Sequence, residues 1–355
     1  MRKSVLLFVL IGVVFLPGAC KKGGAEGGGT GNTVQTETGG TGSAVETKTG
    51  EAETGSADKG PAAESNLSWT VTREEGEAYV SDTLGNRIPL EQYRRMVVLS
   101  PGAVETLYLI GGEEAIAGIA SGREALWPED KTVLLPSVGN TARPNLENII
   151  ALEPDLVIGN AMTAALIQDL GGRGYRGIVH QADSIEDIFN GTEILGRLAG
   201  RAEAAERLNA EKRAGLGELQ EELRLRPLKL KGAFLYSAGP IMAFTEASLP
   251  GEILTALGVE NIAAGLDAAQ PILSPEYILS QDPDFLFGAM AITKPADILA
   301  ADSRIAETRA GREMNISIIP SSLFIRPSPR ILESIPELYA TLRQYEAKNS
   351  GDLSP

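Results

Sequence analysis

The chain has almost none of the side chains that build disulfide frameworks and transition-metal sites. Its 355 residues include one cysteine, Cys20, and one histidine, His180. A single thiol excludes a disulfide framework and a cysteine-based zinc site, and a single imidazole supplies too few ligands for a bare transition metal. We therefore expect no resident metal site in this protein.

Positive charge is also scarce. The chain has 32 Lys and Arg against 47 Asp and Glu, which gives a formal charge of −15. Residues 1–19 contribute +2 and residues 21–66 contribute −3, so residues 67–355 carry −14. A protein with this charge is not expected to bind nucleic acid.

The apolar run near the start of the chain is too short to cross a bilayer as a helix. It covers the 13 residues from Ser4 to Leu16 and follows the basic pair Arg2-Lys3, which predicts an export signal over residues 1–19. Gly18-Ala19 then precede Cys20, and this segment resembles the lipobox of bacterial lipoproteins, where the cysteine is lipidated and becomes the mature N-terminus. The alternative is ordinary secretory cleavage with a spare thiol.

The next segment lacks the apolar residues that a folded core needs. Residues 21–66 contain twelve glycines and no aromatic side chain, with repeats of the Thr-Gly-Gly-Thr-Gly and Glu-Thr-Gly kind. This composition predicts a disordered tether over residues 20–66. A lipid at Cys20 would be its membrane attachment.

From residue 67 the pattern is that of an α/β protein. Residues 69–90 alternate as antiparallel strands do, with turns at Gly76 and at Gly85-Asn86. Buried strands at 96–100, 115–120 and 156–158 then alternate with helical patterns at 103–110 and 145–152. Such alternation favours a parallel sheet covered by helices.

The folded part contains an internal repeat. Residues 145–158 reappear as residues 274–287, with Glu, Ile, Pro and Asp at the same positions and four further positions apolar in both. Residues 105–113 likewise match residues 252–260, each after a buried strand. We therefore expect two similar α/β lobes.

Between the lobes, residues 184–226 read as one long helical stretch that is rich in Ala, Leu, Glu and Arg, with Gly191, Gly196 and Gly200 as positions where it could soften. The expected organisation is an N-terminal lobe over 67–183, an interlobe helix over 184–226, a C-terminal lobe over 227–346 and a tail over 347–355.

Several of these segments resemble one protein family. They are residues 97–101 with Glu105-Thr-Leu, residues 144–158, residues 258–262 and the run Arg326-Pro-Ser-Pro-Arg330. They are similar to the substrate-binding proteins of bacterial ABC importers for iron-siderophores, haem and vitamin B12, and the resemblance covers about residues 69–346. It implies two Rossmann-like lobes with mainly parallel sheets, joined by a single long helix, and a solute held in the cleft between them. The partners it implies are a permease dimer with its ATPase, and we expect a monomer.

Two glutamates occupy corresponding places in the internal repeat. Glu147 and Glu276 each lie early in a helix, off its apolar face. The resemblance implies that they dock on arginines of the two permease subunits. The alternative is that they only interact favourably with the helix dipole.

The loops that follow the strands are expected to face the cleft. They carry the arginines Arg123, Arg143 and Arg326 and a few aromatic residues, namely Trp127, Phe244 and Phe324. Guanidinium groups in an acidic protein suggest an anionic ligand, so we expect a ferric chelate of the siderophore kind. The alternatives are haem or cobalamin, and arginines that only pair with local acids such as Glu124 or Glu147.

Two motifs indicate other functions only weakly. Gly172 to Gly177 spells GxGxxG but follows a helix and precedes a strand, which is the reverse of the dinucleotide-binding order. No sequence feature pairs His180 with Ser100 or Ser237, so we expect no enzyme and no cofactor other than the lipid. A stand-alone surface or sensor lipoprotein remains an alternative to the importer component.

Overall fold

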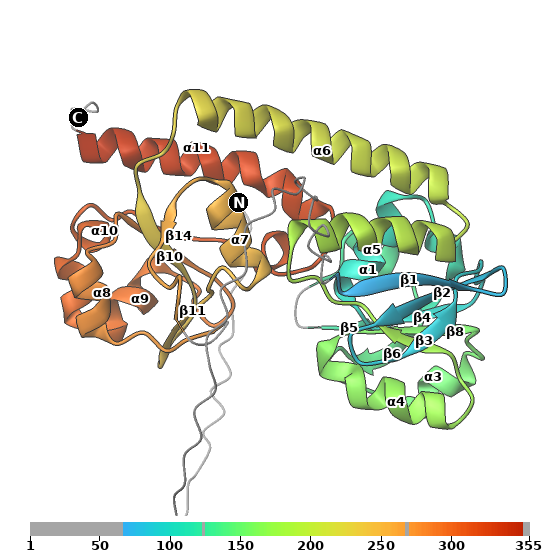
Figure 1. Cartoon of the computed structure of the whole chain (residues 1–355). Coiled ribbons are helices and arrows are strands. Elements are labelled where there is room, and N and C mark those ends of the chain that lie inside the picture. The colour runs from blue at the N-terminus through green and yellow to red at the C-terminus, as the bar shows by residue number, and fades with distance from the viewer. Residues whose placement is uncertain (1–66, 123–124, 267–269, 351–355) are drawn as a thin grey trace, which may run out of the picture. The chain divides into compact units, whose positions relative to one another are not determined.

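The structure is a computed structural model that describes residues 67–122, 125–266 and 270–350 (Figure 1). The described residues belong to one compact unit of the chain. They begin with a small antiparallel sheet of β1 (Trp69–Glu74), β2 (Glu77–Asp82) and β3 (Arg87–Pro89). Gly76 and Gly85, with φ angles of 91° and 84°, lie in its turns, so the predicted antiparallel start is confirmed.

The N-lobe is built on a six-stranded sheet with strand order β7-β6-β5-β4-β8-β9, in which only β7 is antiparallel to its neighbour. Its strands are β4 (Met96–Val98), β5 (Ile116–Ser121), β6 (Ser137–Asn140), β7 (Arg143–Pro144), β8 (Leu156–Gly159) and β9 (Gly177–Val179). Its helical elements are α1 (Pro101–Leu109), η1 (Glu113–Ala115), α2 (Glu129–Thr132), α3 (Leu146–Ala151), η2 (Ala161–Thr163), α4 (Ala164–Gly172) and α5 (Ile185–Leu198).

Alternate residues of β4 serve two cores, as the period of two in a strand requires. Met96 and Val98 pack with α1 and α5 on one face of the sheet. Val97 packs with α3 and α4 on the other face. The N-lobe is therefore a parallel sheet between two helical layers.

The C-lobe repeats this design with a five-stranded sheet of order β11-β10-β13-β14, to which β12 adds beside β10. Only β11 is antiparallel. Its strands are β10 (Lys231–Ala238), β11 (Ile241–Ala243), β12 (Glu260–Asn261), β13 (Phe285–Gly288) and β14 (Ile316–Ile318). Its helical elements are α7 (Leu249–Ala256), α8 (Pro275–Gln281), α9 (Pro295–Ala301), η3 (Ser303–Glu307), α10 (Arg309–Arg312), η4 (Ser321–Leu323) and α11 (Arg330–Ser350). Helices α7 and α11 cover one face, and α8, α9 and α10 cover the other.

The stretch predicted as one interlobe helix forms two helices. Helix α5 ends at Leu198, and α6 (Ala202–Leu225) begins after a turn in which Gly200 has a φ of +68°. Glycine adopts this left-handed conformation at little cost, which ends α5 and turns the chain back. Gly196 lets the two helices approach, because a Cβ there would lie 2.5 Å from the Cβ of Ala205.

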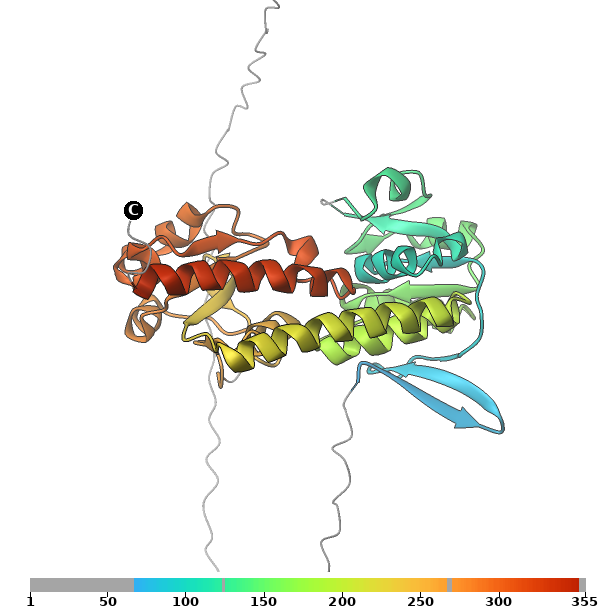
Figure 2. The ribbon, with the colours of Figure 1, turned by 90° about the horizontal axis from the view of Figure 1, so that it is seen from above.

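Helix α6 is the single long helix that spans the two lobes. Ala205, near its start, belongs to the N-lobe core, and Leu223, near its end, belongs to the C-lobe core. Figure 2 shows α6 and α11 side by side, and a salt bridge of 2.9 Å from Lys212 to Glu333 joins them. None of the described helices is long and apolar enough to cross a membrane.

The internal repeat has a structural counterpart in each lobe. The repeated segments form α3 with β8 and α8 with β13, and the helices begin at the N-caps Asn145 and Ser274. Both helices end with a residue of positive φ at the same repeat position, Glu153 at 46° and Asp282 at 42°. The prediction of two similar lobes is confirmed.

Candidate functional site

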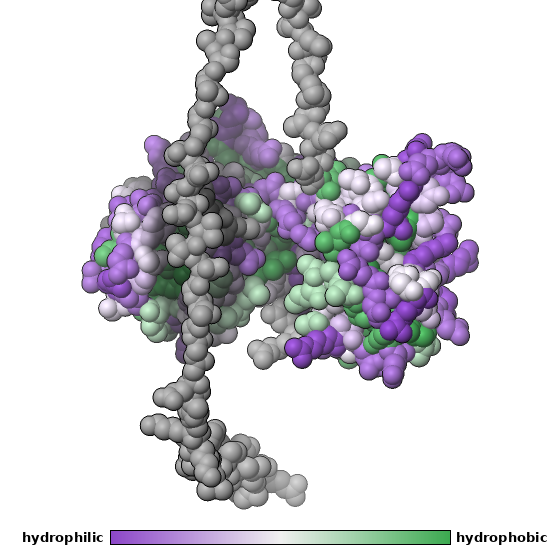
Figure 3. Space-filling model, turned by 60° about the horizontal axis from the view of Figure 1, so that its bottom comes forward, coloured by the Kyte–Doolittle hydropathy of each residue, from purple (hydrophilic) through white to green (hydrophobic). Residues whose placement is uncertain are grey.

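The parallel strands of each lobe end at loops that are the expected place for a ligand in such sheets. In the N-lobe these loops include those that begin at Leu99, Gly122, Asn160 and His180, and in the C-lobe those that begin at Gly239, Ala289 and Ile319. In Figure 3 pale and green residues lie on the sides of the two lobes that face each other, whereas purple residues dominate their outer ends. On this view the visible surface near the middle of the molecule is therefore less polar than its outer ends.

Arg326, which was expected to hold a ligand, is engaged by a carboxylate of the other lobe. Its Nη1 lies 2.8 Å from Oε1 of Glu105 in α1 and 3.1 Å from the carbonyl oxygen of Ala125. The Glu105 side chain is fully buried, and its Oε2 accepts a hydrogen bond of 2.9 Å from the Ser328 hydroxyl. This guanidinium thus serves a contact between the lobes, which the prediction from sequence missed.

Trp127 is the aromatic residue of the predicted set that stays partly exposed, at 37%. It lies in the loop after β5, and the guanidinium carbon of Arg330 is 4.7 Å from its ring centroid. Arg330 in turn lies 3.3 Å from Oε1 of Glu105. Trp127 can offer a ring to a ligand from this position.

The expectation that Phe244 and Phe324 line the cleft is wrong. Phe324 is fully buried and stacks on Phe234 with ring centroids 4.2 Å apart. Phe244 is also buried, 5.7 Å from the same ring and 4.8 Å from the ring of Tyr236. These rings form part of the C-lobe core, because a large aromatic side chain is stabilised most when it is fully removed from water.

The other two predicted arginines have different outcomes. Arg143 lies in β7, where it pairs with Asn140 of β6, and its side chain is exposed. No side-chain partner of Arg143 occurs among the described residues, so its guanidinium is available to a ligand. Arg123 lies outside the described residues, as does Cys20.

Exposed apolar side chains at the strand ends were not predicted. Met162 follows β8 in the N-lobe and is 68% exposed, while Met290 follows β13 in the C-lobe and is 56% exposed. Ile272, which forms an antiparallel β-bridge with Met242 of β11, is 66% exposed. The available sequence signal was an apolar residue in a loop directly after a buried strand. Thioether and alkyl groups of this kind suit the face of a large apolar ligand.

His180 and Ser100 come together, although no sequence feature paired them. Ser100 Oγ lies 3.0 Å from His180 Nδ1, and both residues are buried. Ser100 also caps α1, and the His180 ring packs edge-on against Trp69. Burial lowers the pKa of His180 to about 4, while Asp187 opposes this shift. The pair therefore serves as a neutral packed contact rather than as an exposed nucleophile and base.

The two proposed docking glutamates differ in their surroundings. Glu147 in α3 and Glu276 in α8 are both exposed. Glu276 contacts Arg304, whose hydrogen bond lowers the pKa of this carboxyl, and Arg304 also binds Asp302 at 2.7 Å. For Glu147 the described residues include no ion-pair partner.

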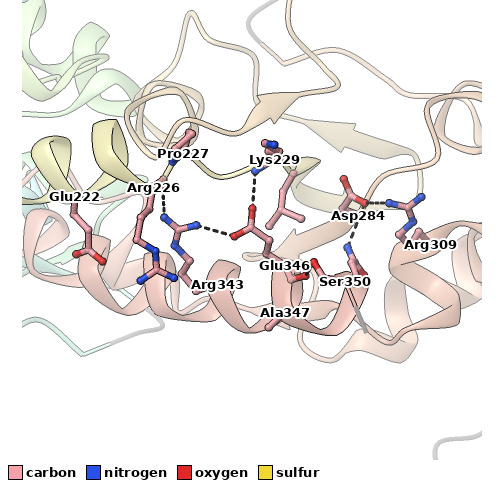
Figure 4. A pocket seen from close by; sticks show the side chains of 12 residues that line it. Glu222, Arg226, Pro227, Lys229, Asp284, Arg309, Arg343, Glu346, Ala347 and Ser350 are labelled. Atoms are coloured by element: carbon pink, nitrogen blue, oxygen red, sulfur yellow. Dashed lines mark hydrogen bonds and ion pairs between the residues drawn. The ribbon is translucent and has the colours of Figure 1, made fainter. Parts of the chain in front are cut away.

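A cavity of about 610 Å³ lies at the opposite end of the C-lobe sheet (Figure 4). Lys229 and Asp284 line it just before β10 and β13 begin. Its acids are already engaged, since Asp284 binds Arg309 and Glu346 binds Arg343, both at 2.7 Å.

No group of three or more potential metal ligands occurs in the described part of the chain.

Comparison with known proteins assigns the family. Residues 96–323, which carry most of both sheets, match the sequence profile described as periplasmic binding protein. The chain belongs to the periplasmic binding protein family. Members of this family that resemble the chain are the extracytoplasmic substrate-binding proteins of ABC importers, so the resemblance stated above is confirmed.

Two relatives illustrate the match to this family. A cobalamin-binding protein of Halobacterium salinarum is 27% identical over 253 residues, 67% of this chain and 66% of the relative, so slightly less than two thirds of that protein is matched. A vitamin B12-binding protein of Vibrio campbellii is 27% identical over 262 residues, 71% of this chain and 91% of the relative.

Solved structures of periplasmic binding proteins share the fold. The haem-binding protein RhuT of Roseiflexus sp. RS-1 superposes with a TM-score of 0.64 at 23% identity, covering 72% of this chain and 99% of RhuT. The vitamin B12-binding protein BtuF of Vibrio cholerae gives a TM-score of 0.60 at 20% identity, covering 71% and 97%. The two-lobe α/β fold predicted from the sequence is therefore confirmed.

Proposed function

We propose that this protein captures a metal chelate with a large apolar face, a corrinoid of the cobalamin type, between its two lobes and delivers it to an ABC permease. The observation that carries this proposal is the pair Met162 and Met290, exposed at strand ends of opposite lobes. The names of the Halobacterium and Vibrio relatives support it. The engagement of Arg326 by Glu105 weakens the earlier case for an anionic chelate.

A ferric chelate of the siderophore kind is the second candidate. It is favoured by the exposed guanidinium of Arg143 at the β6–β7 edge. An arginine there could donate two parallel hydrogen bonds to a carboxylate, catecholate or hydroxamate. The two candidates differ in whether apolar contact or charge dominates the affinity.

Calorimetric titration of the purified protein with cyanocobalamin, haemin and ferrichrome tests the proposal. We expect cyanocobalamin to bind most tightly, and Met162→Ala or Met290→Ala to weaken it by roughly tenfold because each loses about 1 to 2 kcal/mol of apolar contact. Arg143→Ala should change its affinity by less than about twofold.

Met314→Ala is the matched control, because Met314 is similarly exposed, at 53%, but precedes β14 at the other end of the sheet. Tight binding of ferrichrome alone, lost in Arg143→Ala and kept in the methionine variants, would replace the corrinoid by the ferric chelate. Turnover of any of these ligands would contradict a binding protein without enzymatic activity.

The membrane side of the proposal involves an anchor and a docking surface. A lipid at Cys20 would hold the protein at the outer face of a membrane, and Glu147 and Glu276 would meet arginines of the permease dimer. One exposed acid in each lobe, at equivalent repeat positions, fits a receptor with two subunits. A stand-alone sensor would need no such pair.

Docking is tested with the importer reconstituted in vesicles. Glu147→Arg should lower the ATPase stimulation by this protein several-fold, since it replaces an attraction by a repulsion, while ligand affinity stays unchanged. Glu276→Arg should have a smaller effect, because Arg304 already offsets this acid. A loss of ligand affinity in either variant would instead place the glutamate in the ligand site.

A further inference from the structure

The contact between the lobes centres on a buried carboxylate. Glu105 in α1 has no exposed side-chain surface, yet its side-chain partners among the described residues come from the C-lobe segment 326–330. Arg326, Ser328 and Arg330 reach its two oxygens at 2.8, 2.9 and 3.3 Å. A buried carboxylate is very costly without such partners, so this contact strongly favours one arrangement of the segment on α1.

The backbone of this segment also lies close to α1. A Cβ on Gly102 would lie 2.5 Å from the carbonyl oxygen of Pro327. The segment is thus held by close packing on one side and by ionic hydrogen bonds on the other. Arg330, the first residue of α11, is consequently fixed in place, and its side chain is only 16% exposed.

Arg330 connects the buried carboxylate to the partly exposed Trp127. Its guanidinium binds Glu105 and lies over the Trp127 ring. A cation over an aromatic face is attracted to it, and a planar guanidinium also stacks on the ring. The orientation of Trp127 in the loop after β5 is therefore tied to a residue of the opposite lobe.

The equivalent glutamate of the internal repeat makes a different contact. Glu252 in α7 accepts a hydrogen bond of 2.6 Å from the backbone N–H of Ile185, at the start of α5. Burial raises the pKa of Glu252, and Asp187 and Glu186 add to this rise. Both glutamates thus fix the first turn of a helix that reaches toward the other lobe, but only Glu105 is linked to Trp127.

We infer that Glu105 is a positioning residue for the solute site: through Arg330 it holds the indole of Trp127 in the orientation that a bound ligand meets. The inference deepens the proposed function, on which its ligand measurement rests. Glu105 itself would not touch the ligand. Its effect is to pre-organise one aromatic contact and the segment of the C-lobe that supports it.

Fluorine NMR of the full chain labelled with 5-fluorotryptophan tests the inference without any ligand. The chain has two tryptophans, the buried Trp69 and the partly exposed Trp127, and Trp127→Phe assigns their resonances. Glu105→Gln keeps the size of the side chain and removes its charge. We expect it to shift or broaden the Trp127 resonance and to leave that of Trp69 in place.

Two control variants separate this route from a general loosening of the fold. Glu252→Gln changes the equivalent residue of the repeat, and Glu114→Gln changes an N-lobe carboxylate that is 89% exposed. Neither should move the Trp127 resonance. Arg330→Met keeps the Glu105–Arg326 pair and should reproduce the shift, which decides the question if Glu105→Gln does not fold.

Titration of the same variants with cyanocobalamin adds the functional measurement. Glu105→Gln and Arg330→Met should weaken binding roughly fivefold to tenfold, mainly through faster dissociation, whereas Glu114→Gln should not. An unmoved Trp127 resonance in both variants, or an equal shift in Glu252→Gln, would overturn the inference. If the unaltered protein binds no cobalamin, the proposed ligand is wrong. The fluorine spectra, which need no ligand, would still test whether Glu105 orients Trp127.

Discussion

His180 illustrates how burial alone decides the behaviour of a side chain. The imidazole is packed against Trp69 and shares one hydrogen bond with the Ser100 hydroxyl. Its charged form is disfavoured because burial removes the hydration of the ring, and the negative charge of Asp187 offsets this loss only in part. As the only histidine of the chain, it can be followed in solution without assignment work.

We expect the proton resonance of the His180 ring to stay unchanged from pH 8 to pH 5 and to titrate near pH 4. The folded pKa lies below the ordinary value of 6.5, so the unfolded chain binds the proton more readily between these two values. The free energy of unfolding should therefore fall by on the order of 3 kcal/mol from this group as the pH drops from 6.5 to 4.

Urea unfolding at pH 7 and at pH 4.5 measures this loss, with His180→Gln as the variant that should be less sensitive to acid. Other groups titrate in the same window, so the comparison between the two proteins is the informative one. A titration midpoint near 6.5 would show that the ring is solvated and that the buried contact with Ser100 is absent.

At the residue scale, the sequence predicted which loops carry side chains but not where the side chains point. Trp127 and Arg143 are exposed in the predicted loops, while Phe244, Phe324 and Arg326 turn inward. The difference depends on contacts far apart in sequence: Phe234 lies 90 positions from Phe324, and Glu105 lies 221 positions from Arg326. No local pattern contains that information.

The ends of helices α3 and α8 show how a repeat constrains single elements. Each helix stops at a residue with a left-handed backbone, Glu153 or Asp282, before the Pro-Asp pair that leads into the next strand. Glycine is the usual residue for this conformation, which costs other residues about 1 kcal/mol or more. The chain accepts this cost twice.

We expect Glu153→Gly to stabilise the protein by about 0.5 to 1 kcal/mol, because it removes the backbone strain and the Glu153 side chain is exposed. Asp282→Gly should give a smaller gain or a loss, since the Asp282 carboxylate accepts a hydrogen bond of 2.7 Å from the Arg309 backbone. Thermal unfolding followed by circular dichroism compares the two. Destabilisation by Glu153→Gly would mean that its φ is not positive in solution.

Element identity was largely predictable from sequence, and element boundaries were less so. The strands and the repeated helices follow from runs of apolar residues and from caps such as Asn145 and Ser274. The break at Gly200 was harder to see, because residues 184–226 favour helix throughout by composition. Gly200, whose left-handed backbone ends α5, was only one of three glycines in this stretch, and the packing of α6 back against α5 is a tertiary effect that composition does not show.

At the scale of the whole molecule, Gly102 marks a place where the two lobes pack closely. A methyl group there would lie 2.5 Å from the Pro327 carbonyl oxygen, so one of the two lobes would have to move. We expect Gly102→Ala to cost about 1 to 3 kcal/mol of stability through this overlap and to weaken ligand binding by displacing the segment 326–330.

Gly171→Ala is the matched control in the same lobe. A Cβ at this position in α4 meets nothing within 4 Å, so the substitution should stabilise the protein by about 0.5 to 1 kcal/mol through the lower entropy of the unfolded chain. Chemical denaturation and cyanocobalamin titration of both variants check the pair. Equal stabilities would show that the lobes are not packed at Gly102.

Helix α6 has a consequence for how this protein can vary. Each residue in a helix adds about 1.5 Å and a rotation of about 100°. Ala205 is anchored in one core and Leu223 in the other, so inserting or deleting a single residue between them would turn one lobe by more than a quarter of a revolution against the other. Surface loops tolerate changes in length. The length of α6, in contrast, fixes the rotation of one half of the solute site relative to the other.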